Sequence, residues 1–260
     1  MKLRIRALGA HNLETLDTKH TCFLVNDSLS IDAGSLMTTL DADERNGLKS
    51  ILLTHRHFDH IRDLPSLGLS TMDSGLTIDL YGMVETLDAV KSHLINGVVY
   101  PDFTQKPSPE RPKFSLRSLT PGRMFSPTGF DVKAIAVPHS APAVGFLLRS
   151  PQGGVAAFTG DTGGGLTAFL GDSFKPSIFF VEVTYPNQLE ERARSQGHLC
   201  PAVLLEELNM VQAKGIPIPS IVAVHMNGQY RDTIAIELAR IASALRVDIT
   251  PAVDGAEFQI

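Results

Sequence analysis

Three histidines and an aspartate occupy six positions of this 260-residue chain, directly after a short apolar segment. The segment spans residues 50–54, and His55, His57, Asp59 and His60 follow it. A run this short and this rich in leucine and isoleucine is typical of a buried strand. Neutral imidazole and carboxylate groups are ligands for Zn²⁺ and neighbouring first-row metals. The pattern therefore predicts a metal site at the end of a β-strand.

Three more candidate ligands follow strand-like runs further along the chain. His139 comes after the run at 130–137, Asp161 after 154–158 and His225 after 219–224. A lone histidine is most often a buried or surface imidazole without a role. The shared position at a strand end favours metal ligation for all three residues, because a rigid sheet can fix the geometry of several ligands at once.

The order of the expected elements indicates an α/β fold in one domain, residues 1–260. Strands dominate the middle of each half, and helices follow them. Two β-sheets packed together and covered by helices fit this order. Strands are predicted at 2–9, 21–26, 28–32, 50–54, 76–81, 130–137, 143–149, 154–158, 177–183, 219–224 and 256–260, and helices at 35–45, 83–95, 201–214 and 232–245.

Residues 100–127 differ from the rest because six prolines interrupt them and basic residues outnumber acidic ones. Prolines break regular structure, so this segment is predicted to be a loop excursion. Two interpretations stay open. The loop is either a plain surface crossing or a flap over the site that attracts an anionic substrate.

Charge and composition exclude some classes of protein. The net charge of −5 argues against an extended nucleic-acid surface. No apolar stretch has the length of a membrane span, and the N-terminal residues 1–6 alternate charged and apolar side chains, unlike a signal peptide. Two cysteines, Cys22 and Cys200, make no disulfide framework. We therefore expect a cytoplasmic protein without a membrane partner.

The stretch 54–60 reads Thr-His-x-His-x-Asp-His, which resembles the most specific motif of the metallo-β-lactamase superfamily. Leu8-Gly9 and the stretch 31–34 also fit, so the resemblance covers nearly the whole chain. It implies an αββα sandwich of two mixed sheets flanked by helices. It also implies two metal sites, with His55, His57 and His139 at the first, Asp59, His60 and His225 at the second, and Asp161 bridging them.

The implied cofactors are two divalent ions, Zn²⁺ in the first instance, with Mn²⁺ or Fe as alternatives. Such a pair can hold a hydroxide at neutral pH, which supplies the nucleophile of a hydrolase. Asp59 and Asp161 would help to position that hydroxide. Asp32 is interpreted either as a partner of a ligand histidine or as a turn-forming residue before Ala33-Gly34.

Glu182 ends a strand-like run, and His198 precedes a predicted helix in the sequence Gly-His-Leu-Cys-Pro. This pair resembles the subgroup that contains class II cyclic-nucleotide phosphodiesterases and tRNA 3′-processing endonucleases. His198, held by Glu182, would donate a proton to the leaving group or bind a phosphate oxygen. Otherwise the two residues are a helix cap and a surface group. The chain departs from the phosphodiesterase signature at three positions. The signature favours a leucine where this chain has Phe58, a small residue where it has Asp63 and a basic residue where it has Asn227.

The leading functional hypothesis is a binuclear metal-dependent phosphodiesterase. Its substrate would be a cyclic or other small nucleotide, and Asp59, Glu182 and His198 would be its catalytic residues. The alternatives are an RNA-processing endonuclease, a thioester hydrolase or oxidoreductase on the same fold, and a non-catalytic metal-binding protein. The expected partner is a small anionic substrate, and the resemblance also allows a homodimer.

Overall fold

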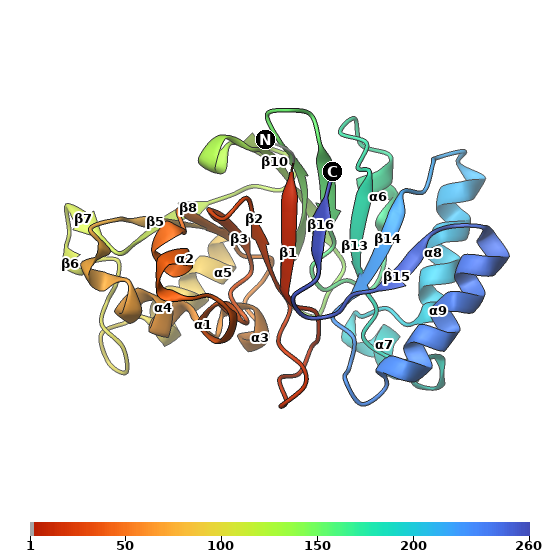
Figure 1. Ribbon diagram of the computed structural model, residues 1–260, viewed down its shortest axis with the longest axis horizontal. Helices are drawn as coiled ribbons and strands as arrows, with labels where there is room; N and C mark the ends of the chain where they lie inside the picture. The colour runs from red at the N-terminus through yellow and green to blue at the C-terminus, as the bar shows by residue number, and fades with distance from the viewer. Residues whose placement is uncertain (1–2) are drawn as a thin grey trace.

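Two seven-stranded mixed sheets pack face to face in the computed structural model, which describes residues 3–260. Helices cover the outer face of each sheet, as Figure 1 shows. This is the αββα sandwich predicted from the sequence, and the prediction of the fold is confirmed.

The first sheet comes mainly from the N-terminal half of the chain. Its strand order is β16 (Glu257–Gln259), β1 (Arg4–Gly9), β2 (Cys22–Val25), β3 (Leu29–Ile31), β4 (Ser50–Leu52), β5 (Ile78–Gly82) and β8 (Phe114–Ser118). The pairings from β16 to β3 are antiparallel, and those from β3 to β8 are parallel. The C-terminal strand β16 thus closes the sheet beside β1. The predicted strand 2–9 is observed as β1, and its residue 2 lies outside the described residues.

The second sheet comes from the C-terminal half. Its strand order is β15 (Ile249–Pro251), β14 (Ser220–Val224), β13 (Ile178–Glu182), β12 (Val155–Phe158), β11 (Ala143–Arg149), β10 (Asp131–Val137) and β9 (Met124–Phe125). The four strands β12 to β15 are parallel, and the pairings from β12 to β9 are antiparallel. In both sheets a parallel half therefore presents its carboxyl ends at one edge.

Three apolar clusters separate the layers. The central cluster joins the two sheets and is centred on the stacked rings of Phe158 and Phe180, 4.7 Å apart, with Phe23 tilted against both. The outer cluster of the first sheet lies under α1 (Leu36–Thr39), α4 (Leu64–Ser70) and α5 (Val84–Ala89). That of the second lies under α6 (Leu166–Leu170), α7 (Glu190–Gln196), α8 (Pro201–Ala213) and α9 (Arg231–Leu245).

Two predicted helices are interrupted in the structure. The helix predicted at 35–45 is divided into α1 and α2 (Ala42–Gly47), because Asp41 caps α2 in a reciprocal pair with Glu44. The helix predicted at 83–95 is α5 followed by a π-helix, η2 (Val90–Leu94). Three short helices, α4, α6 and α7, were not predicted.

The prediction of a loop over residues 100–127 was wrong in part. The segment begins irregularly and contains a small hairpin, β6 (Pro107–Ser108) and β7 (Arg111–Pro112). It then supplies β8 to the first sheet and β9 to the second. The prolines lie outside both of these strands, so they do not prevent strand pairing. The segment connects the two sheets at their edges (Figure 1), which favours the surface-crossing interpretation over a flap.

Among the described residues, none of the helices combines the length and the apolar character that crossing a membrane would require.

Candidate metal centre

The candidate ligands converge at the edge where the parallel strands of both sheets end. His55 and His57 follow β4, and the short helix α3 (Phe58–Ile61) then carries Asp59 and His60. From the second sheet, His139 follows β10, Asp161 follows β12 and His225 follows β14. The carboxyl ends of parallel strands meet at one edge, and binding sites are commonly built there in open α/β sheets. The structure thus brings together all seven residues predicted as ligands.

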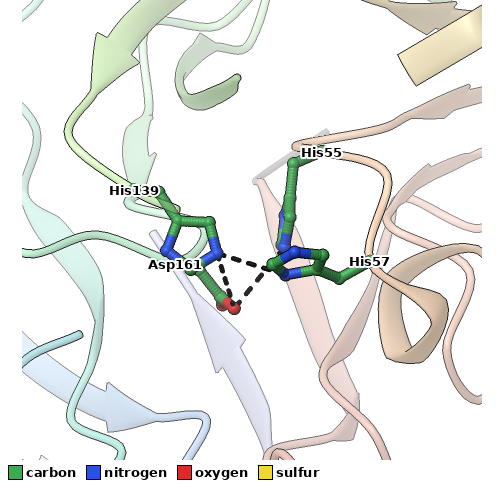
Figure 2. A group of neighbouring side chains, drawn as sticks. All are labelled: His55, His57, His139 and Asp161. Atoms are coloured by element: carbon green, nitrogen blue, oxygen red, sulfur yellow. Dashed lines mark hydrogen bonds and ion pairs between the residues drawn. The ribbon is translucent and has the colours of Figure 1, made fainter. Parts of the chain in front are cut away.

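His55, His57, His139 and Asp161 form the first group (Figure 2), with ligand atoms all within 4.8 Å of one another. Nε2 of His139 lies 3.2 Å from Nδ1 of His57. Oδ2 of Asp161 lies 3.6 Å from Nε2 of His55 and 3.8 Å from Nε2 of His139. Three nitrogen atoms and one oxygen atom therefore surround one point, an arrangement that suits a tetrahedral divalent metal.

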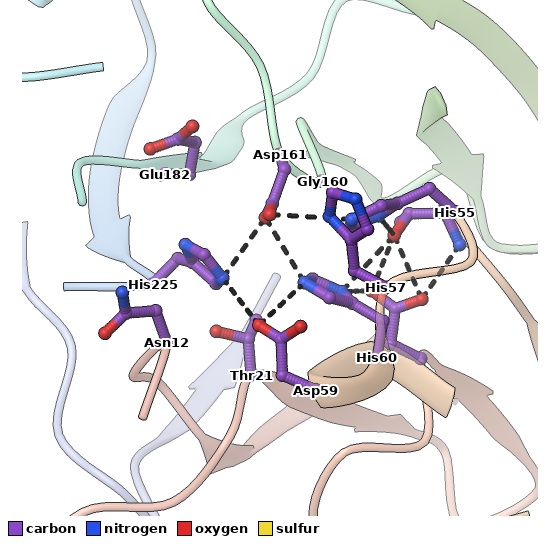
Figure 3. A network of polar contacts seen from close by, with 12 residues as sticks. Asn12, Thr21, His55, His57, Asp59, His60, Gly160, Asp161, Glu182 and His225 are labelled. Carbon is purple, nitrogen blue, oxygen red and sulfur yellow. Dashed lines mark hydrogen bonds and ion pairs between the residues drawn. The ribbon is translucent and has the colours of Figure 1, made fainter. Parts of the chain in front are cut away.

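Asp59, His60, His225 and Asp161 form the second group (Figure 3). Oδ1 of Asp161 lies 3.3 Å from Nε2 of His60 and 3.3 Å from Nε2 of His225. Oδ2 of Asp59 lies 3.4 Å and 3.2 Å from the same two nitrogen atoms. The two oxygen atoms of Asp161 thus face different groups, which is the arrangement that a bridging carboxylate needs.

Unpaired buried atoms show that these groups fit cations. Nε2 of His55, Nε2 of His60 and Oδ1 of Asp161 are buried and have no hydrogen-bond partner among the described residues. Each buried polar atom without a partner costs about 1–3 kcal/mol. All three belong to the two groups, so metal ions bound at both groups would satisfy them.

The protonation states of the first group favour metal binding as well. Burial lowers the pKa of His55, His57 and His139, which keeps these rings neutral with a lone pair available. Burial alone would raise the pKa of Asp161, but His225, His60 and His55 outweigh it and lower that pKa well below its ordinary value. The first group therefore combines neutral imidazoles with an ionised carboxylate.

Asp32 and Thr54 hold the histidines of the first sheet. Oδ2 of Asp32 lies 2.7 Å from Nδ1 of His60, and the Thr54 hydroxyl donates to the same oxygen at 2.9 Å. Nδ1 of His55 lies 3.1 Å from the Thr54 hydroxyl. Using Nδ1 in this way leaves Nε2 of both rings for a metal. Asp32 itself has a positive φ of 60°, as a turn residue can have. It is therefore both the hydrogen-bonding partner of a candidate ligand histidine and a turn-forming residue, the two roles considered from the sequence.

Glu182 and Thr184 repeat this arrangement in the second sheet. The Thr184 hydroxyl donates to Oε2 of Glu182 at 2.8 Å and lies 2.9 Å from Nδ1 of His225. Nδ1 of His198 lies 2.8 Å from Oε1 of Glu182 and 3.2 Å from the same hydroxyl. Glu182, His198 and His225 also lie close enough to be a third ligand group. Their mutual hydrogen bonds through Thr184 already satisfy these atoms, so a further ion is not needed.

His198 occupies the turn between α7 and α8, beside the first group. Its ring lies 5.0 Å from that of His139 and 5.5 Å from that of His225, measured between centroids. Burial lowers its pKa, but the charge and hydrogen bond of Glu182 outweigh burial and raise it to about 9. The raised pKa favours the protonated ring, with Nδ1 engaged by Glu182 and Nε2 remaining.

Gly197 brings the His198 turn against the ligand His139. Its carbonyl oxygen lies 2.9 Å from Nδ1 of His139. Its φ is +72°, and a Cβ atom at this position would lie 2.9 Å from Cα of His139. Glycine is required here for two reasons. Only glycine adopts a positive φ freely, and only glycine lets the backbone approach His139 this closely.

Thr54, Thr184 and Gly197 make supporting contacts that the sequence did not predict, although Thr54 and Gly197 lie within the motifs. Their signals were weak, since two are threonines next to acidic or histidine strand ends and one is a glycine before His198. Cys200 belongs to none of the three ligand groups in residues 3–260 and is fully buried at the start of α8, as expected for a small apolar thiol.

The chain is similar to several known proteins. Residues 22–226 match the beta-lactamase superfamily domain. A probable 3′,5′-cyclic-nucleotide phosphodiesterase of Yersinia pestis is 26% identical over 200 residues, which is 67% of this chain and 56% of that protein. A ribonuclease Z of Methanococcus maripaludis is 29% identical over 104 residues, 39% of this chain and 32% of that protein. The chain thus spans little more than half the length of the first of these relatives.

A solved structure shows the same fold over the full length of this chain. Unliganded yeast PDE1 covers 100% of this chain and 99% of its own, with a TM-score of 0.85 and 17% sequence identity.

Proposed function

The chain belongs to the beta-lactamase superfamily of metal-dependent hydrolases, and on this premise we propose that it hydrolyses the phosphodiester bond of a cyclic or other small nucleotide. The observation that carries the proposal is the 2.8 Å contact between Nδ1 of His198 and Oε1 of Glu182, next to the two ligand groups. The similarity to the Yersinia pestis phosphodiesterase supports the same substrate class.

Two divalent ions would be held by the chain. His55, His57 and His139 would hold the first and Asp59, His60 and His225 the second, with Asp161 contacting both. Zn²⁺ suits this mixture of imidazole and carboxylate, and Mn²⁺ or Fe²⁺ would also be accepted. Bound together, such ions act as Lewis acids on the phosphoryl oxygens and lower the pKa of water.

Asp59 is the carboxylate best placed to orient the attacking water. It lies at the mouth of the second group, and its side chain stays 24% exposed, whereas that of Asp161 is 3% exposed. His60 and His225 outweigh the effect of burial and lower the pKa of Asp59, so this carboxylate is ionised. It can therefore accept a hydrogen bond from water that enters from solvent.

His198 would act as the general acid. Hydrolysis joins water to phosphorus and breaks the bond from phosphorus to the ribose oxygen, which leaves as an alkoxide and needs a proton. The protonated ring supplies that proton from Nε2, while Glu182 stabilises the positive charge through Nδ1. The attacking water releases one proton to solvent, and solvent returns one to His198, so a cyclic nucleotide gives a single product with a phosphomonoester and a free ribose hydroxyl.

The experiment compares substrates whose leaving groups differ. Protein loaded with Zn²⁺ or Mn²⁺ is assayed with 3′,5′-cyclic AMP, a 2′,3′-cyclic nucleotide and bis(p-nitrophenyl) phosphate, together with His198→Ala. We expect cyclic-nucleotide turnover to fall by about 10²–10⁴-fold in the variant, the usual contribution of a general acid. Turnover of the nitrophenyl ester should fall far less, because nitrophenolate leaves without a proton.

His198→Asn is the matched control, because it keeps a hydrogen-bond donor but cannot transfer a proton. If it restores activity, His198 binds a phosphate oxygen instead of acting as an acid. The phosphodiesterase proposal fails if protein that holds two metals per chain cleaves none of the three substrates.

An RNA-processing endonuclease is the second candidate. The ribonuclease Z of Methanococcus maripaludis supports it through its 29% identity over 104 residues. The same metal-loaded protein would then cleave a tRNA precursor near its 3′ end, and cyclic nucleotides would be poor substrates. Assaying both substrates side by side separates the two candidates.

A further inference from the structure

A cavity of about 580 Å³ opens beside the first ligand group and has no part in the mechanism above. One wall is formed by Arg56, His57, Phe58 and Ile61, in the motif turn and α3, and the other by α5 with the π-helix η2. His57 lies in the wall of this cavity and in the ligand group, so the two spaces adjoin. The volume lies within the range of small-molecule sites, about 300–1,000 Å³.

A second cavity touches the ligands but is too small for any part of a substrate. It lies beneath Asp161, His60 and His225 and holds only about 10 Å³, room for one water molecule. A substrate whose phosphate lies at the ligand groups must place its remaining bulk elsewhere. The cavity beside His57 has the required space and a shared wall.

Phe58 gives this cavity an aromatic surface. It is the first residue of α3, and 62% of its surface is exposed although it stands between two buried or half-buried ligands. An exposed aromatic ring that lines a cavity offers a flat face on which a nucleobase can stack. Removing one such ring weakens nucleotide binding roughly 5- to 150-fold.

The opposite wall carries polar groups on the α-helix α5 and on the π-helix η2 that continues it. Glu85 and Asp88 on α5 and His93 on η2 are exposed and line the cavity. π-helices are rare and occur frequently at functional sites. The two carboxylates are hydrogen-bond acceptors only, so they select a partner that presents N–H groups.

We propose that this cavity is the nucleoside subsite of the enzyme, with the base stacked on Phe58 and its exocyclic amino group bonded to Glu85 or Asp88. The proposal rests on the phosphodiesterase function proposed above. It predicts that bases with an amino group bind better than uracil, which presents a carbonyl oxygen at the corresponding position.

A fluorescence measurement tests the subsite without turnover. The chain contains no tryptophan, so Phe58→Trp introduces a single indole into the cavity. Cytidine and uridine are the probes, because both are pyrimidine nucleosides and cytidine presents an amino group with two N–H donors where uridine has a carbonyl oxygen beside a single ring N–H. We expect cytidine to change the indole emission saturably and to bind about tenfold tighter than uridine. Replacing Glu85 by Gln and Asp88 by Asn should remove this difference.

Met124→Trp is the matched control, since Met124 is 57% exposed on β9 and does not line the cavity. The subsite proposal is overturned if the indole at 58 gives no saturable response. It is also overturned if the indole at 124 responds equally, or if cytidine and uridine bind alike.

Phe58→Ala separates this proposal from the proposed function. We expect the KM for 3′,5′-cyclic AMP to rise roughly 5- to 150-fold while kcat and the metal content change little. Cyclic-nucleotide turnover with an unchanged KM would sink the subsite and leave the phosphodiesterase standing. Nucleoside binding by metal-loaded protein that cleaves none of the three phosphodiester substrates would sink the phosphodiesterase and leave a nucleoside site.

Discussion

The hydroxyl of Thr184 lies 2.9 Å from Nδ1 of His225, on the side of the ring opposite the ligand groups. The same hydroxyl contacts Glu182 and His198. It has one hydrogen, which it gives to Glu182, so it can only accept from the histidines. Thr184 therefore fixes the protonated nitrogen of a candidate metal ligand and of the candidate acid together.

Thr184→Val should weaken metal binding. Valine has nearly the same shape but no hydroxyl, so His225 loses the partner that fixes its ring. Loss of such a supporting contact commonly costs about 10–100-fold in metal affinity, which chelator competition measures. Thr184→Ser keeps the hydroxyl and should stay near the wild-type affinity. If Val and Ser behave alike, the contact has no role in binding.

Gly197→Ala should disturb the first ligand group. The new Cβ atom would meet Cα of His139 at 2.9 Å, and φ would stay at +72°. We expect a loss of about 1–3 kcal/mol in the free energy of unfolding, together with weaker binding of the first metal. Urea denaturation and metal titration are the measurements.

Gly215→Ala is the control for that substitution. Gly215 has a similar φ of +65°, but a Cβ atom added there would meet no other part of the chain within 4 Å. It should lose stability through the backbone alone and keep full metal affinity. Equal metal affinity in the two variants would show that the contact with His139 is unimportant.

Glu207→Ala should destabilise the turn after Asp161. Oε2 of Glu207 accepts hydrogen bonds from the backbone N–H groups of Gly165 and Leu166 at the start of α6, at 3.0 Å and 2.9 Å. Without the carboxylate both groups lose their partner, at a cost of about 1–3 kcal/mol. Its exposed neighbour gives the control, since Glu206→Ala should change the free energy of unfolding by less than about 0.5 kcal/mol.

Lys113→Met should destabilise the first sheet. The Lys113 side chain is buried, and its ammonium donates to the carbonyl oxygens of Thr71 and Leu76 and to the Ser74 hydroxyl, at 2.7–2.9 Å. Losing these bonds to a charged donor should cost about 1.5–3 kcal/mol at neutral pH. Urea denaturation measures it, and exposed Lys106→Met should be nearly neutral.

Lys113 should also make stability depend on pH. Burial lowers its pKa from 10.5 to about 8. Between these values the unfolded chain holds the proton and the folded chain has lost it, so raising the pH favours folding. Relative to Lys113→Met, the wild-type protein should therefore gain stability from pH 7 to pH 10, by up to about 2 kcal/mol. If the difference in the free energy of unfolding between the wild-type protein and Lys113→Met stays constant over this pH range, the lowered pKa of Lys113 is contradicted.

The sequence predicted best those strands and site residues that can be recognised from residue type and local position alone. Short apolar runs that end in histidine or aspartate identified β4, β10, β12 and β14 and the seven residues that meet at their ends. The proline-rich segment misled, because β8 is held by pairing with β5, a contact between residues far apart in the chain.

The supporting contacts could not be predicted for a similar reason. The role of a threonine hydroxyl depends on the polar groups that the fold places beside it. Thr184 contacts His198 and His225 only because three separate elements pack together. The π-helix η2 could not be predicted either, since the apolar residues of 83–95 have the spacing of an ordinary α-helix.

The candidate ligands are divided between the two sheets. Residues 55–60 belong to the first, and His139, Asp161 and His225 belong to the second. Bound ions would therefore cross-link the halves of the molecule, and ligand binding to the folded state stabilises it by mass action. Metal supply would then govern how long the protein survives proteolysis as well as how fast it works.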